Sequence, residues 1–236
     1  MKKKVSKRFI QRNSNEITKL FDEFRHLNRN KVFDDFLTIC LCTFHQTNLQ
    51  SGMKIKDEEN EKLYADTIKG YKTKDLEVFS EIIAVFMKYI AEHPYTDPLG
   101  EYYEQYFADE CLGQFFTPME ICKFMAMLNL VNRTFIAKTV ADACCGSGRT
   151  LIAYAERSPT SYFFGCDLNA TTAKLCALNF FINGMCGEVA HGDSLGFQYF
   201  KVWQINMNGL GIKPIKSEDS IFCIHEFRKK ETQSNY

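Results

Sequence analysis

The sequence predicts an α/β protein in which a helical N-terminal region, residues 1–112, precedes a domain built on a parallel sheet, residues 113–236. Three observations lead to this prediction. Apolar residues in the first region recur at helical spacing, the second region alternates between strand and helix patterns, and a glycine-rich turn follows its first strand. Repetition of strand, turn and helix is typical of a parallel sheet with right-handed crossovers.

Two long helices are predicted in the first region. Residues 16–46 carry apolar side chains three and four positions apart, with an interruption expected at residues 28–30. Residues 75–93 show the same spacing, and Pro94 follows directly, as is common just beyond a helix end. The polar segment 52–60 between them is predicted to be a loop.

The next segment changes from turn to helix. Residues 97–100, Asp-Pro-Leu-Gly, predict a turn, and residues 101–107 predict a short aromatic helix. Thr117 and Pro118 then have the residue types favoured at the N-cap and first position of a further helix.

Strand and helix patterns alternate from residue 139 onward. Each strand is a short apolar run, and each helix follows a polar or glycine-rich turn. The predicted elements are strand 139–142, turn 145–148, helix 149–156, strand 162–167, helix 170–183, strand 188–193, a strand ending near residue 205, and strand 220–227.

Composition excludes several classes of protein. The chain has 236 residues and a formal net charge of zero, so binding to nucleic acid would need a local basic patch. The basic residues within segment 2–8 either contact DNA phosphates or form a solvated tail. No run approaches the roughly 18 apolar residues of a membrane span. The start of the chain lacks the apolar core of a secretory signal.

The ten cysteines are interpreted as reduced thiols that pack as small hydrophobes. Most lie inside apolar runs, and no C-x-x-C pair is present. The five histidines are scattered, so no metal site is expected. Together these features predict a cytoplasmic protein.

Three acidic residues, Asp142, Asp167 and Asp193, end three successive predicted strands. Ligands of open parallel sheets bind at the carboxyl ends of the strands, so we expect these carboxylates to converge. Gly146 and Gly148 permit a sharp turn close to a ligand. Asp167 stands where a carboxylate accepts both hydroxyls of a ribose, and Asp193 is suited to the exocyclic amine of a purine. A strand-terminal Asp that only caps the next helix is the alternative for each.

NAD and S-adenosylmethionine both fit such an arrangement. The turn departs from G-x-G-x-x-G because position 151 is Leu, which argues against a pyrophosphate ligand. A loop that begins with Asp142 and ends in Gly-Ser-Gly is better suited to an aminoacyl group, whose carboxylate would meet backbone N–H groups while an acid faces the ammonium. This comparison favours S-adenosylmethionine.

Four segments together resemble the adenine-N6 DNA methyltransferases, and most closely the modification subunits of type I restriction systems. They are Gly-Gln-Phe-Phe-Thr-Pro at 113–118, Ala-Asp-Ala-Cys-Cys-Gly-Ser-Gly at 141–148, Gly-Cys-Asp-Leu-Asn at 165–169, and Gly-Asp-Ser-Leu at 192–195. The resemblance covers about residues 97–208 and implies a Rossmann-like, S-adenosylmethionine-dependent methyltransferase fold. It also implies DNA as substrate and a specificity subunit or other restriction-modification subunit as partner.

The resemblance implies a role for each candidate residue. Phe116 and Thr117 would contact the methionine part of S-adenosylmethionine, while Asp142, Gly146 and Gly148 would form its loop. By the same resemblance Asp167 would hold the ribose and Asp193 would face the adenine ring.

The family's catalytic Asn-Pro-Pro-aromatic tetrapeptide has no direct equivalent in this chain. Asn206 is the predicted catalytic residue by position, with Met207, Asn208 and Gly209 in place of the prolines and the aromatic ring. Gly209 cannot stack on a flipped base, which costs ~1–3 kcal/mol per base. The family sheet has further strands, so we expect a sheet truncated at the C-terminus. A non-catalytic cofactor-binding or regulatory relative, and a methyltransferase acting on RNA or protein, remain as alternatives.

Overall fold

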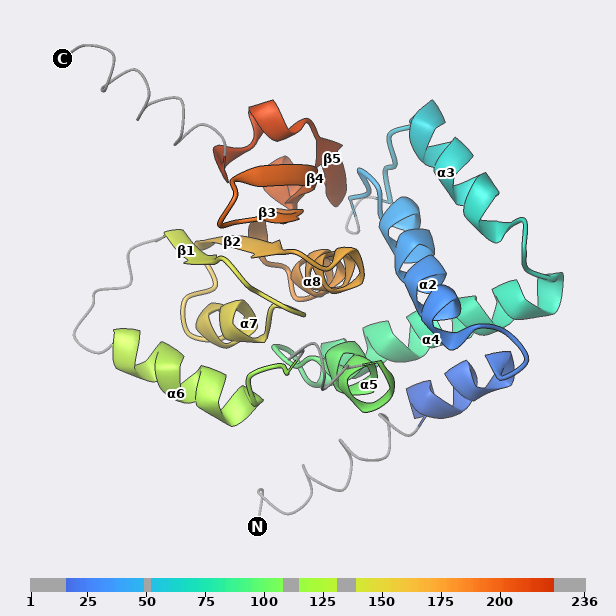
Figure 1. Ribbon diagram of the computed structural model, residues 1–236, viewed down its shortest axis with the longest axis horizontal. Coiled ribbons are helices and arrows are strands. Elements are labelled where there is room, and N and C mark those ends of the chain that lie inside the picture. The colour runs from blue at the N-terminus through green and yellow to red at the C-terminus, as the bar shows by residue number, and fades with distance from the viewer. Residues whose placement is uncertain (1–15, 49–51, 108–114, 131–138, 223–236) are drawn as a thin grey trace. The chain divides into compact units, whose positions relative to one another are not determined.

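The computed structural model describes residues 16–48, 52–107, 115–130 and 139–222 (Figure 1). Contacts divide the chain into two compact units. The helical unit comprises Met1–Thr43 and Lys56–Phe116, and the sheet unit comprises Phe44–Ile55 and Thr117–Tyr236. This division differs from a boundary after residue 112, because the sheet unit also takes in the segment 44–55 from the first half of the chain.

The helical unit follows the predicted apolar spacing in its long helices. The helix is interrupted, but earlier than at the predicted residues 28–30: residues 25–28 lie outside any helix, and Arg29 and Asn30 already belong to the next one. The polar segment predicted as a loop is shorter than expected, because the Asp57 carboxylate accepts the N–H of Asn60 at 3.0 Å and starts a helix there. The described helices are residues 16–21, η1 (Asp22–Phe24), α2 (Arg29–Thr43), α3 (Glu58–Ile68), α4 (Thr73–Glu92) and α5 (Pro98–Tyr106).

The prediction of a turn at residues 97–100 is wrong, because α5 already begins at Pro98. The Asp97 side chain is buried and accepts the N–H of Gly100 at 2.9 Å, which makes it the N-cap. Pro98 takes the first helical position, where the missing N–H costs nothing. The Asp-Pro-Leu-Gly sequence that was predicted to be a turn is therefore the start of a helix.

Aromatic rings form the core of the helical unit. Phe21 stacks on Tyr102 with ring centroids 4.6 Å apart and meets the edge of Phe36 at 5.2 Å. Phe24 stacks on Phe79 at 4.6 Å. Burial of such rings and their offset contacts stabilise the packing of α2, α4 and α5.

The sheet unit contains a five-stranded sheet in the order β1-β2-β3-β4-β5 (Figure 1). β1 to β3 are parallel, as predicted, whereas β4 and β5 run antiparallel to their neighbours. Only residues 194–197 separate β3 from β4, and so short a connection allows only an antiparallel return. The elements are α6 (Met119–Leu130), β1 (Thr139–Asp142), α7 (Arg149–Ala155), β2 (Tyr162–Asp167), α8 (Ala170–Ile182), β3 (Cys186–Asp193), β4 (Gln198–Ile205), η3 (Met207–Gly209), β5 (Ile212–Ile215) and η4 (Ser217–Asp219).

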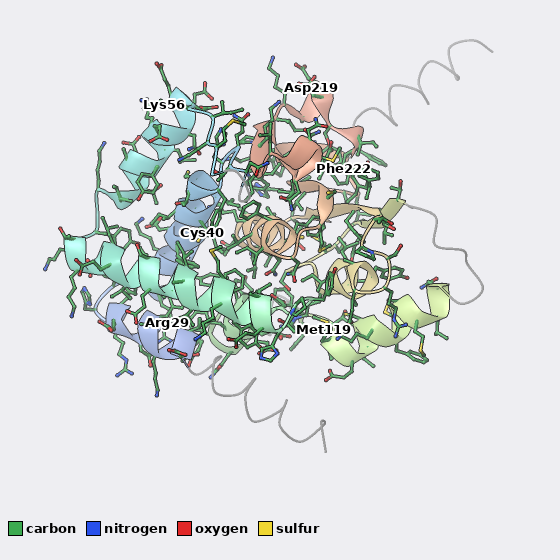
Figure 2. All side chains as sticks on the ribbon, turned by 180° about the vertical axis from the view of Figure 1, so that it is seen from behind. Arg29, Cys40, Lys56, Met119, Asp219 and Phe222 are labelled. Atoms are coloured by element: carbon green, nitrogen blue, oxygen red, sulfur yellow. The ribbon has the colours of Figure 1, made fainter. Side chains whose placement is uncertain are left out.

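The two crossover helices, α7 and α8, lie on one side of the sheet (Figure 1), as two right-handed crossovers in the same direction require. On the other side, the ring of Phe222 (labelled in Figure 2) packs against Phe164 and Tyr199, with ring centroids 5.9 Å and 5.3 Å apart. The buried Glu188 carboxylate of β3 accepts the Ser220 hydroxyl at 2.7 Å and so ties this segment to the sheet. Both sides of the strand pair β2–β3 are thus covered.

The predicted strand at 220–227 is wrong over its described part, because residues 221–222 are helical. Residues 223–227 lie outside the described residues. The edge next to β5 is instead joined by residues 44–48. The N–H of Gln46 donates to the Ile212 carbonyl at 3.0 Å, and the N–H of Ile212 donates to the Phe44 carbonyl at 3.1 Å. Among the described residues, none forms a helix that is both long and apolar enough to cross a bilayer.

Candidate functional site

The structure brings Asp142, Asp167 and Asp193 to one edge of the sheet. They end β1, β2 and β3, which are adjacent and parallel. In the ladder Asp142 is opposite Gly165, two residues before Asp167, and Asp167 is opposite His191, two residues before Asp193. All three carboxylates are partly exposed at this carboxyl edge. The predicted convergence of their strand ends is therefore present.

Each of these carboxylates is oriented by its own loop. In every case one oxygen accepts the N–H of the residue two positions further along, which is an Asx turn. The donors are Cys144 to Asp142 at 3.1 Å, Asn169 to Asp167 at 2.9 Å, and Leu195 to Asp193 at 3.0 Å. These carboxylates thus act in local turns, and the alternative that they only cap the next helix does not hold, since the N-caps of α7 and α8 are Gly148 and Asn169.

Asp167 differs from the other two because it also makes contacts beyond its own loop. Its Oδ2 accepts the N–H of Gly146, in the turn after β1, at 2.8 Å. Its Oδ1 accepts the Thr172 hydroxyl, in the first turn of α8, at 2.8 Å. One carboxylate therefore links the glycine-rich turn, the end of β2 and the start of α8.

The turn between β1 and α7 needs glycine at two positions. Gly146 has φ 54° and Gly148 has φ 90°, in the region that disfavours side chains. At Gly148 there is also no room, since an added Cβ would lie 2.8 Å from the Cys176 Sγ. The turn is closed by the N–H of Gly148, which donates to the Cys145 carbonyl at 2.8 Å.

One face of α8 supports this turn from behind. The side chain of Asn179 donates to the Ser147 carbonyl at 2.9 Å, and both residues are buried. Thr172, Cys176 and Asn179 are spaced by four and three residues, so they share a helix face. The sequence analysis did not identify Thr172 or Asn179 as site residues. Both are polar residues of a mainly apolar helix, but Thr171 and Lys174 are polar too, so the sequence alone did not single them out.

Two thiols beside the turn, Cys145 and Cys166, have raised pKa values. A hydrogen bond with Cys176 and burial raise the pKa of the Cys145 thiol well above its usual range. Burial raises the pKa of Cys166, at the end of β2, to about 12. A thiol with a raised pKa is a poor nucleophile at neutral pH, so these residues pack the site and do not react in it.

Phe116 and Thr117 are divided between the two units. Phe116 belongs to the helical unit, where its N–H donates to the Glu104 carboxylate at 3.2 Å and its ring stacks on Tyr103 at 5.5 Å. Thr117 is exposed in the sheet unit, and its carbonyl accepts the Cys122 thiol at 3.5 Å. Of this pair, Thr117 shares the unit of the three carboxylates.

The structure places Asn206 away from the carboxyl edge where Asp142, Asp167 and Asp193 lie, and its catalytic role stays a prediction. Because β4 is antiparallel, its last residue Ile205 pairs with Gly187 near the start of β3, at the opposite edge. The Asn206 amide donates to the Met185 carbonyl at 2.9 Å, and its backbone is left-handed with φ 53°. Asn206 is a turn residue that ties β4 to the loop after α8.

Comparisons with known proteins match the region that contains these residues to one protein family. Residues 95–210 match the family described as N-6 DNA Methylase. This part of the chain is similar to the N-6 DNA methylases. The matched region contains every candidate residue discussed above, from Phe116 to Asn206.

One relative of this N-6 DNA methylase region is the type I restriction enzyme MjaVIII methylase subunit of Methanocaldococcus jannaschii, 28% identical over 152 residues. That alignment covers 60% of this chain and 26% of the relative, so the chain spans about a quarter of the relative's length. A crystal structure of a type I restriction-modification methyltransferase subunit from Streptococcus thermophilus is also similar, with a TM-score of 0.38 and 18% identity. The similarity covers 75% of this chain and 56% of that one.

Proposed function

We propose that this chain binds S-adenosylmethionine at the carboxyl edge of β1 to β3, as the cofactor-binding part of an adenine-N6 DNA methyltransferase of the type I restriction-modification class. The observation that carries the proposal is the bond between Asp167 and the Gly146 N–H, inside the N-6 DNA methylase region. It joins a ribose-binding type of carboxylate to a glycine turn, the two features that a nucleoside with an aminoacyl tail requires.

The open acceptor positions of the edge are suited to this ligand. Asp142 and Asp193 are partly exposed, so each has acceptor positions open to solvent. In our assignment Asp142, Gly146 and Gly148 surround the methionine part, which Thr117 of the same unit also contacts. Asp167 accepts from the ribose, and Asp193 accepts from the adenine amine. When bound, S-adenosylmethionine supplies an electrophilic methyl group on its sulfonium.

The chemistry of transfer needs a further group. The amine of a flipped adenine must be oriented by acceptors next to the methyl donor. Asn206 lies at the other edge of the sheet, so we assign that role to no described residue of this chain. We propose that a restriction-modification partner subunit completes the reaction on DNA in the cytoplasm. A non-catalytic cofactor-binding relative is the second candidate, favoured by the position of Asn206.

Calorimetric titration with S-adenosylmethionine tests the proposal. We expect the wild type to bind and Asp167→Ala to lose binding, because the ribose loses its acceptor and the turn loses its tie to β2. Asp219→Ala is the matched control, since Asp219 (Figure 2) is exposed in η4 and should bind as the wild type does. Unchanged affinity in Asp167→Ala would refute the ribose assignment.

Transfer of a labelled methyl group from S-adenosylmethionine to adenine-containing DNA separates the two candidates. Transfer supports the methyltransferase, whereas binding without transfer supports the non-catalytic relative.

A further inference from the structure

Thr172 is a buried polar residue at the start of α8. It is 3% exposed, and its hydroxyl donates to Asp167 Oδ1 at 2.8 Å, with the Asn169 carbonyl also within reach at 3.0 Å. Asn169 is the N-cap of α8, and its side chain accepts the N–H of Thr172 at 3.1 Å. The cap therefore fixes the backbone of Thr172, and the branched side chain has few rotamers with which to turn away.

The described contacts of Asp167 distinguish its two oxygens. Oδ1 accepts from the Asn169 N–H and from the Thr172 hydroxyl, so both of its lone pairs are engaged. Oδ2 accepts only the Gly146 N–H among the described residues. An ionised carboxylate has about four acceptor positions, and here the remaining one is on Oδ2. That Asp167 accepts ribose hydroxyls stays a prediction, and these contacts indicate Oδ2 as the accepting oxygen.

We propose that Thr172 is a positioning residue: it holds Oδ1 of Asp167 so that Oδ2 presents its remaining acceptor position to one ribose hydroxyl of the bound nucleoside. This inference rests on the proposed function and deepens it. Thr172 acts through Asp167 and does not touch the ligand. Its contribution is preorganisation, because a carboxylate already held in place loses less freedom when the ligand binds.

Three variants of the full chain test the role of the hydroxyl. Thr172→Val removes it with little change in volume, Thr172→Ser retains it, and Thr171→Val makes the same change at the neighbouring, partly exposed position. The probe is S-adenosylhomocysteine, which has the same ribose, followed by titration calorimetry, with a thermal melt of each variant. We expect Thr172→Val to bind about tenfold more weakly, the fold-change that corresponds to roughly 1.4 kcal/mol. Thr172→Ser and Thr171→Val should stay close to the wild type.

Two analogues of the probe, lacking either the 2′- or the 3′-hydroxyl, supply a readout that loss of folding would not mimic. In the wild type we expect one analogue to bind more weakly and the other to bind nearly as the parent does, since only one acceptor position is open. For the analogue that has lost the contacting hydroxyl, Thr172→Val and the wild type should bind alike. The comparison of the two analogues on the wild-type protein remains decisive even where Thr172→Val does not fold.

Wild-type affinity in Thr172→Val, equal weakening by both analogues, or failure of Thr172→Ser to restore binding would each overturn the inference. A wild type that binds no S-adenosylhomocysteine would instead refute the proposed function, and this inference with it. Binding by the wild type with no effect of Thr172→Val refutes the role of Thr172 alone.

Discussion

Replacing Gly148 by alanine should destabilise the sheet unit by more than the cost of a left-handed backbone alone. Gly148 has φ 90°, and an added Cβ would lie 2.8 Å from Cys176 Sγ and 3.5 Å from Phe180. The left-handed backbone costs a non-glycine residue ~1–2 kcal/mol. Forcing a methyl group into a packed core costs ~1–3 kcal/mol more. The free energy of unfolding should therefore fall by ~2–5 kcal/mol in Gly148→Ala.

Gly184→Ala is the matched control for the backbone cost. Gly184 has φ 67°, close to that of Gly148 in sign and region, but nothing lies within 4 Å of an added Cβ. Its destabilisation should be limited to ~1–2 kcal/mol. The difference between the two variants isolates the clash with α8. The double variant Gly148→Ala with Cys176→Ala should recover part of it, because the smaller side chain removes the nearest atom.

Urea unfolding followed by fluorescence measures these changes in the sheet unit alone. The chain has one tryptophan, and Trp203 lies buried in β4 of that unit. Equal destabilisation by Gly148→Ala and Gly184→Ala would show that contact with Cys176 does not constrain the turn. The same conclusion would follow if the double variant were no more stable than the sum of its single changes predicts.

Two further predictions concern the surroundings of the turn. Asn179→Ala should lower the free energy of unfolding by ~1–3 kcal/mol, because the buried Ser147 carbonyl loses its donor; Asn129→Ala, exposed on α6, should change the same urea curve little, and comparable losses would refute the role of Asn179. At pH 8 an aromatic disulfide reagent should label exposed Cys144 quickly and Cys166 only after unfolding, because a pKa of about 12 keeps the Cys166 thiol protonated until the pH approaches that value. Peptide mapping by mass spectrometry checks this, and rapid labelling of Cys166 in folded protein would contradict it.

Local sequence signals predicted most of the carboxyl edge of β1 to β3. The β2 strand at 162–167 was predicted to the residue, and the turn with Gly146 and Gly148 lies where the glycines indicated it. Such features depend on side-chain alternation and on backbone freedom, which neighbouring residues already decide. The segment around Asp97 shows the limit of local signals, because Asp-Pro begins a turn and a helix equally well.

By itself, the sequence determined which residues end strands β1, β2 and β3, and so which carboxylates stand at the carboxyl edge of the sheet, because strand period and turn chemistry are properties of short segments. Only the tertiary structure decided that β4 returns beside β3 and carries Asn206 to the far edge. It also decided that Thr172 and Asn179 of α8 hold Asp167 and the turn. Strand neighbours and helix faces are chosen by packing between segments distant in the chain, and that choice has no signature in either segment alone.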